Sequence, residues 1–300
     1  MLRASSAFGG GAKTSLSTAD RLTGPLPIAR RVASLDEELF SFIDIQSETP
    51  DWDRRSLLAL HSAAAEALGS FCYLEIGSFL GGSLQAVMRD PRCAHVISVD
   101  PRPAESPDNR GPNWIYADNT TAHMLDLLGQ LPDVDISKIS TFERGTDSLR
   151  VDQLRHRPQY CFIDGEHTDH AALRDARFCA EAIGGVGVIA FHDYPIIGQA
   201  IRSFLRDVWS DVSFAVAFTG AVFAVELGGR GILRSEVVTR AVSSNWHSLT
   251  WRLVSRPKST AIPFLLAWSA LPKIDLAVAQ SKQLARRTAQ MRRLRPPPRD

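Results

Sequence analysis

Two short segments bring several ionisable side chains to the point where an apolar run ends. The segment "FIDGEH" leaves its apolar run with Asp164, Glu166 and His167, and the segment "AFHDY" does so with His192 and Asp193. A polar group left unpaired in a protein interior is costly in free energy. These residues are therefore the first candidates for a site with chemistry.

Two kinds of chemistry fit these residue types. Asp164, His192 and Asp193 could hold a divalent cation, since carboxylate oxygens suit Mg²⁺ and an imidazole ligand suits Mn²⁺ better. Alternatively, His167 or His192 could take the proton from a weak nucleophile such as a hydroxyl, with Glu166 as a second choice of base. The residues by themselves leave both possibilities open.

A third segment, "LEIGSFLGGS", indicates a ligand site at the end of an earlier strand. Glu75 ends the apolar run, and Gly77 and Gly81 let the backbone approach a ligand closely. The glycines are not spaced as in a dinucleotide fingerprint. Hydroxyl groups at Ser78 and Ser83, together with the Glu75 carboxylate, suit a ligand that carries an ammonium and a carboxylate group.

The next apolar run, "HVISVD", ends in another acid, Asp100. A carboxylate at the end of the second strand, about 20 residues beyond the glycine turn, is where a ribose is held by its hydroxyls. An amino acid joined to a nucleoside describes S-adenosylmethionine. Glu75 and Asp100 together therefore predict a site for this cofactor.

These candidates lie within an alternation of strand-like and helix-like segments. The expected strands are 71–76, 95–99, 138–142, 159–163, 186–191, 212–218 and 221–227. The expected helices are 53–68, 81–89, 120–129, a short one after Asp147, 168–182 and 197–208. Apolar strands that alternate with helices form parallel sheets covered on both faces, and the last two strands form a hairpin. The sequence thus predicts an α/β fold with a doubly wound, mostly parallel seven-stranded sheet, in which Asp164 and Asp193 end neighbouring strands and converge.

The motifs in this order resemble the class I S-adenosylmethionine-dependent methyltransferases, which have a Rossmann-like fold. The similarity is greatest to the subgroup called methyltransferase family 24, with kinship to sugar O-methyltransferases of natural-product pathways. It covers residues from about 70 to 227. The segments that carry it are "LEIGSFLGGS", "VISVD", "FERGTDSL", "YCFIDGEHTDHAALRDA" and "GGVGVIAFHDY".

The resemblance implies a role for each matching residue. Glu75, Gly77 and Ser83 would contact the methionine part of the cofactor and Asp100 its ribose. The residues implied near the adenine are Gly145, Thr146 and Ser148. An acid after the fourth strand and an acidic pair after the fifth hold a metal in the sugar O-methyltransferases. Here Asp164, which would also lie against the cofactor, is followed by the pair His192-Asp193, and this departure leaves the metal open.

The chain divides into three parts by composition. Residues 1–30 are expected to be flexible, 31–227 to form the methyltransferase domain, and 228–300 to form a basic, partly helical extension. A capping box, "SLDE", predicts a helix start within the second part. The extension could contact an anionic membrane surface or an acidic partner.

Overall composition excludes several classes of protein. A net charge of +1 does not suit a chain that coats nucleic acid. Four scattered cysteines indicate neither a zinc site nor a disulfide framework and fit a reducing cytoplasm. The sequence contains no apolar run long enough to span a membrane and no secretory signal at its start. A homo-oligomer is compatible with the tryptophans near the C-terminus.

The leading prediction is an enzyme that methylates a hydroxyl of a small molecule or saccharide, with or without metal assistance. The alternatives are N-methylation and a non-catalytic module of the same fold that acts through its basic extension.

Overall fold

The computed structural model describes residues 44–109, 111–218 and 220–243. The predicted flexible N-terminus, the capping box and the basic part of the C-terminal extension lie outside the described residues.

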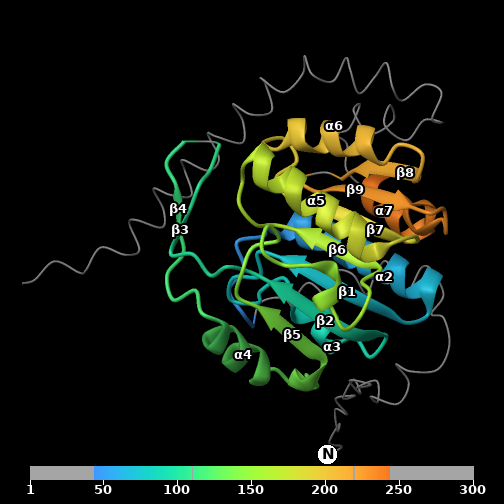
Figure 1. Ribbon diagram of the computed structural model, residues 1–300. Coiled ribbons are helices and arrows are strands. Elements are labelled where there is room, and N and C mark those ends of the chain that lie inside the picture. The colour runs from blue at the N-terminus through green and yellow to red at the C-terminus, as the bar shows by residue number, and fades with distance from the viewer. Residues whose placement is uncertain (1–43, 110, 219, 244–300) are drawn as a thin grey trace, which may run out of the picture.

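A seven-stranded sheet forms the centre of the molecule (Figure 1). Its strands are β1 (Phe71–Ile76), β2 (Cys93–Val99), β5 (Ile139–Phe142), β6 (Tyr160–Ile163), β7 (Gly187–Phe191), β8 (Val212–Ala217) and β9 (Phe223–Leu227). They lie in the order β5-β2-β1-β6-β7-β9-β8. The first five of these are parallel, whereas β9 is antiparallel to both of its neighbours. The predicted doubly wound, mostly parallel sheet is confirmed.

Helices follow the strands as the periodicity indicates. They are α2 (Asp51–Leu68), α3 (Gln85–Arg89), α4 (Thr121–Gly129), α5 (Asp169–Ile183), α6 (Gly198–Asp207) and α7 (Glu236–Ser243), with short 3-10 turns η2 (Ile136–Lys138), η3 (Val151–Gln153) and η4 (Ile232–Arg234). The Thr168 hydroxyl caps α5 by accepting from the N–H of Ala171 at 3.2 Å. Among the described residues, no helix combines the length and apolar character needed to cross a bilayer.

The sheet buries both faces, and β1 shows how. Phe71 and Tyr73 point into a core cluster that also holds α2 and α7, whereas Leu74 and Ile76 point into a second cluster with α5 and α6 (Figure 1). Successive side chains of a strand point to opposite faces, so a strand buried on both sides is apolar throughout. This is why the predicted strands appear as continuous apolar runs.

The packed unit continues beyond residue 227, where the composition suggested a domain boundary. Ile232 in η4 and Val238 in α7 are buried in the same core cluster as α2. The apolar side chains of α7 recur at helical spacing, which places one face of the helix against the core. At least the first part of the predicted extension therefore belongs to the domain.

A hairpin that the sequence did not predict follows β2. Its strands, β3 (Glu105–Ser106) and β4 (Trp114–Ile115), are two residues long and antiparallel. The hairpin stands out from the sheet at the left of Figure 1. We call residues 101–109 and 111–119 the arch.

The close approach of β1 and β6 depends on a glycine at the end of β1. Gly77 has a φ of +87°, and a Cβ built on it would collide with the backbone carbonyl of Asp164. The N–H of Gly77 donates to the carbonyl of Val99 at 2.9 Å, and the N–H of Asp164 donates to that of Ile76 at 2.9 Å. Three strand ends thus meet where only a glycine fits.

Replacing this glycine should destabilise the fold more than replacing one in open space. We expect Gly77→Ala to lower the free energy of unfolding by at least about 2 kcal/mol, because backbone strain and overpacking add. Gly69→Ala is the matched control, since Gly69 has a φ of +75° but nothing within 4 Å of its Cβ position. Urea titration of both variants measures the difference, and equal losses would contradict the packing argument.

Candidate active site

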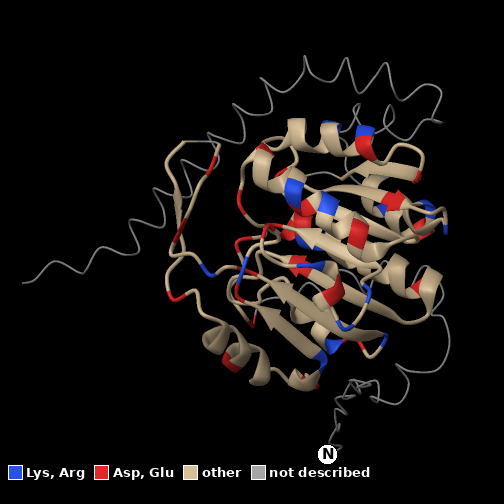
Figure 2. Ribbon diagram, in the orientation of Figure 1, with Lys and Arg blue, Asp and Glu red and all other residues tan. Residues whose placement is uncertain are grey.

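The predicted site residues gather at the edge of the sheet where the parallel strands end. Glu75, Asp100, Asp164 and Asp193 come from the ends of β1, β2, β6 and β7. In Figure 2, several of the loops on that side, at the left of the view, carry acidic residues. The strand order reverses between β1 and β6, the crevice where open α/β sheets bind ligands.

Glu75 is fully buried at the end of β1. Its Oε2 accepts from the Tyr73 hydroxyl and its Oε1 from the Ser83 hydroxyl, both at 2.5 Å. Burial raises the pKa of Glu75 to about 8, although the two hydroxyl bonds act to lower it. At neutral pH the carboxyl group therefore holds a proton that an exposed glutamate would have lost.

The other predicted residues of the turn that follows β1 contact side chains of this same chain. The hydroxyl of Ser78 is buried 2.8 Å from that of Ser98. Gly81 has a φ of +83°, and its Cβ position faces the side chains of Met124 and Leu128. Among the predicted hydroxyls of this turn, only Ser83 is joined to the Glu75 carboxylate.

Asp100 is anchored by the backbone around it. Its Oδ2 accepts from the N–H of Phe79 at 2.9 Å, and its Oδ1 accepts from the N–H of Arg102 at 2.8 Å. The Arg102 guanidinium lies 3.4 Å from Asp100 Oδ2 and also donates to the Phe79 carbonyl. Arg102 thus joins the segments that follow β1 and β2, and no pattern in the sequence predicted this contact.

The residues predicted near the adenine follow β5. Thr146 is buried, donates to Asp175 and accepts from Arg174 Nε at 3.0 Å. Ser148 is exposed, and its hydroxyl donates to the carbonyl of Gly145 at 3.2 Å. Thr146 is therefore tied to α5, whereas Ser148 closes the turn that follows β5.

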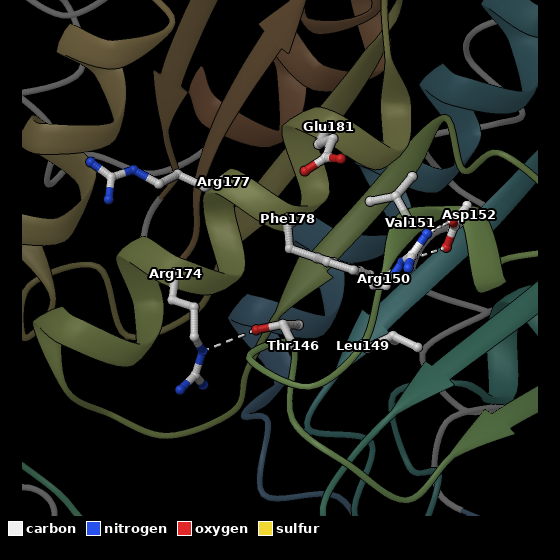
Figure 3. A pocket seen from close by; sticks show the side chains of 9 residues that line it. All are labelled: Thr146, Leu149, Arg150, Val151, Asp152, Arg174, Arg177, Phe178 and Glu181. Carbon is white, nitrogen blue, oxygen red and sulfur yellow. Dashed lines mark hydrogen bonds and ion pairs between the residues drawn. The ribbon is translucent and has the colours of Figure 1, made fainter.

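Thr146 also lines a hollow of about 410 Å³, whose lining residues are shown in Figure 3. The hollow lies between residues 146–152 and α5, and its lining contains none of the site acids. Its arginines are engaged, as Arg150 pairs with Asp152 and Arg177 pairs with Asp207 at 2.6 Å. The hollow is not part of the candidate active site.

The ends of β6 and β7 bring two carboxylates and an imidazole together. Ligand atoms of Asp164, His167 and Asp193 all lie within 4.8 Å of one another. His167 Nε2 is 3.3 Å from Asp193 Oδ2 and 3.9 Å from Asp164 Oδ1. Asp193 has a φ of +51°, uncommon for a residue other than glycine. The predicted convergence of the two aspartates is confirmed, and His167 completes the group.

His192, which the sequence placed among the metal ligands, pairs with carboxylates on both sides. Its Nε2 lies 3.3 Å from Asp53 Oδ2. Its Nδ1 is 2.8 Å from Asp164 Oδ1 and 3.6 Å from Asp193 Oδ2, in ion-pair contact rather than in line for a hydrogen bond. Burial alone would lower the pKa of His192, but Asp164 and Asp193 raise it well above its usual value. The two carboxylates therefore favour the protonated, imidazolium form of the ring.

The electrostatic effect is mutual. Burial would raise the pKa of Asp164, but His192 and then His167 hold it below its usual value. Glu166, the second candidate base, accepts from the Thr168 hydroxyl at 2.7 Å in the turn that starts α5. Among the three predicted bases, His167 is the one whose ring forms a group with both Asp164 and Asp193.

Two acidic residues that the sequence analysis did not predict, Asp53 and Asp108, also lie at the candidate site. Asp53, in the first turn of α2, contacts His192 and accepts from the N–H of Ala221 at 2.8 Å. Asp108, at the tip of the arch, has its Oδ2 3.3 Å from His167 Nδ1. Acids in a helix first turn or a proline-rich loop are usual without any function, so neither carried a signal in the sequence.

The buried carboxyl group of Glu75 makes a specific pH dependence testable. Its pKa is higher in the folded state than in the unfolded state, so stability is lost as pH rises towards 8. We expect the free energy of unfolding of the wild type, without cofactor, to fall relative to Glu75→Gln by up to about 1.4 kcal/mol per pH unit between pH 5 and 8. Urea titrations across this range test it. Glu181→Gln, at an exposed position on α5, should track the wild type.

Comparison with known proteins identifies a protein family that this chain matches. Residues 74–194 match the family model of a methyltransferase domain. The uncharacterized protein R132 of Acanthamoeba polyphaga mimivirus is 26% identical over 144 residues, which cover 45% of this chain. The chain spans 60% of the length of that relative.

Solved structures with a similar arrangement include two further proteins. Cofactor-bound Rv0187 from MTB has a TM-score of 0.44 and 14% identity, with 66% of this chain and 89% of that chain covered. A putative O-methyltransferase from Klebsiella pneumoniae also has a TM-score of 0.44 and 14% identity, with 70% and 93% covered. Taken with the strand order and the matched motifs, the family model leads to one assignment. Residues 74–194 belong to the methyltransferase domain family, and the chain carries a class I, S-adenosylmethionine-dependent methyltransferase domain.

Proposed function

We propose that the protein transfers a methyl group from S-adenosylmethionine to a hydroxyl group of a small molecule or saccharide, with the help of a divalent cation. The observation that carries the proposal is the group formed by Asp164, His167 and Asp193 beside the cofactor strands. Two carboxylates and an imidazole in reach of one another can bind a cation or accept a proton, and O-methylation needs one or the other.

The first two strand ends suit the cofactor by their chemistry. Each oxygen of Asp100 accepts one backbone N–H, which leaves lone pairs for ribose hydroxyls. Glu75, protonated at neutral pH, would ionise beside an ammonium group, because a nearby cation favours the charged form. The cofactor supplies a methyl group already activated on a sulfonium, so the protein's task is to align the acceptor and remove its proton.

The donor set suits Mn²⁺ better than Mg²⁺, because one of its three members is an imidazole. The proposed set replaces the predicted His192 by His167 and keeps Asp164 and Asp193. A bound cation would lower the pKa of the acceptor hydroxyl. His192, as an imidazolium, would compensate part of the charge of the two carboxylates.

The aromatic side chains of the arch favour an acceptor that contains a ring. The rings of Phe79 and Tyr116 lie 5.1 Å apart, and those of Tyr116 and Trp114 lie 6.5 Å apart. Burial raises the pKa of Tyr116, and the carboxylates of Asp164 and Asp100 raise it further, so this phenol lies within electrostatic range of the site acids. An aromatic wall next to the acids suits a sugar or phenolic ring, which can stack on it while a hydroxyl points towards the acids.

Replacing Asp100, the acid proposed to bind the ribose, should weaken binding of the cofactor without unfolding the chain. We expect Asp100→Ala to bind S-adenosylhomocysteine roughly 10- to 150-fold more weakly, since a hydrogen bond to a charged group contributes about 1.5–3 kcal/mol. Isothermal titration calorimetry measures the affinity and circular dichroism the fold. Asp126→Ala, at an exposed position on α4, is the control. Normal binding by folded Asp100→Ala would refute the placement of the cofactor.

Removing the acids after β6 and β7 should stop turnover more than binding. We expect Asp164→Asn and Asp193→Asn to lower the rate at least about 100-fold, the usual size of acid–base contributions. The affinity for S-adenosylhomocysteine should stay within a few-fold of the wild type. A methyl-transfer screen over sugars and phenolics, with a chelator and then with added Mn²⁺ or Mg²⁺, provides the rate. Turnover that resists a chelator would refute the role of the cation. Unchanged turnover in both variants would show that the reaction does not take place at these strand ends.

A further inference from the structure

The side chain of Asp108 is fully buried in a loop whose adjacent residues are exposed. Its carboxylate has no exposed surface, whereas Pro107 and Asn109 are both exposed. Asp108 and His167 form an isolated parallel bridge, and the N–H of Asn109 donates to the carbonyl of His167 at 3.1 Å. The tip of the arch is therefore attached to His167 by backbone and side chain together.

The side-chain contact defines the direction of the His167 ring. Asp108 Oδ2 lies 3.3 Å from Nδ1, and a carboxylate can only accept, so Nδ1 carries a proton. The other nitrogen, Nε2, faces Asp193 Oδ2 at 3.3 Å and Asp164 Oδ1 at 3.9 Å. A bare lone pair opposite two carboxylates is repelled, so Nε2 must hold either a proton or a cation.

We propose that Asp108 is a positioning residue that fixes the orientation of His167 and keeps its Nε2 directed at Asp164 and Asp193. Histidines that bind metals usually donate their second N–H to a carboxylate, which sets the tautomer and raises the basicity of the binding nitrogen. The same arrangement orients a histidine that acts as a general base. This inference rests on the proposed function, because it gives the arch a role in orienting a residue of the proposed active site.

The second histidine of the site provides an internal comparison. His192 presents the opposite nitrogen to its outer acid, with Nε2 3.3 Å from Asp53 and Nδ1 towards Asp164. If each acid orients its own ring, a change at Asp108 should alter His167 and leave His192 as it is.

Long-range proton–nitrogen NMR of the ¹⁵N-histidine-labelled full chain tests the ring directly. We expect the wild type to carry a proton on Nδ1 of His167, and Mg²⁺ to shift the Nε2 signal. In Asp108→Asn, the amide can donate to Nδ1, so the Nδ1 proton should be lost from part or all of the population. His167→Gln assigns the signal. A neutral wild-type ring protonated on Nε2 would overturn the proposal without any need for the variant to fold.

Metal affinity is the second readout. Electron paramagnetic resonance titration with Mn²⁺ alone should show that Asp108→Asn weakens binding about 10- to 100-fold, the usual effect of losing the carboxylate behind a histidine ligand. Asp126→Asn, the same change at an exposed position, should bind as the wild type does. Unchanged affinity together with an unchanged tautomer in Asp108→Asn would refute the positioning role. If the wild type bound no Mn²⁺, the proposed cation would fail, but the NMR result would still decide the role of Asp108.

Discussion

The close approach of β1 and β6 is the constraint on which the site depends. Gly77 lies against the backbone of Asp164, and hydrogen bonds join this point to β2. Any side chain at residue 77 would push the strand ends apart. Because the approach is tight, the strand ends proposed to hold the cofactor lie directly beside those proposed to carry the chemistry.

The glycines of the turn after β1 have a packing role that the sequence analysis did not predict. The sequence suggested that they let a ligand approach the backbone. In the structure, the Cβ positions of Gly77, Gly81 and Gly82 face the Asp164 backbone, α4 side chains and the segment at Gln46 respectively. Packing within the chain therefore already requires a small residue at these positions.

The charges of the site are balanced across elements that are distant in sequence. His192 lies between Asp53 of α2 and the aspartates of β6 and β7, while His167 lies between Asp108 of the arch and the same aspartates. Burying an ion without a partner is costly, so each contact helps to hold its element against the sheet. Helix α2 and the arch therefore each contribute an acid to the candidate site.

The sequence by itself determined the sheet and the acids at its edge. Continuous apolar runs such as 71–76 and 187–191 alternate with helical segments, and the acids that follow the strands become neighbours once the sheet is parallel. Glu75, Asp100, Asp164 and Asp193 could therefore be predicted as strand-end acids. The cofactor contacts assigned to these acids and to the neighbouring glycine, serine and threonine residues all stay predictions.

Only the tertiary structure decided which histidine meets both aspartates and which acids support it. The arch hairpin, Arg102, Asp53 and Asp108 lie in segments without a repeating pattern, or on a helix turn whose neighbours are set by packing. The direction of a side chain in a turn depends on the backbone angles there, as the φ of +51° at Asp193 shows. The partners of these side chains also lie more than 50 residues away along the chain, as Asp108 does from His167 and Asp53 from His192, and no local pattern of residues predicts such contacts.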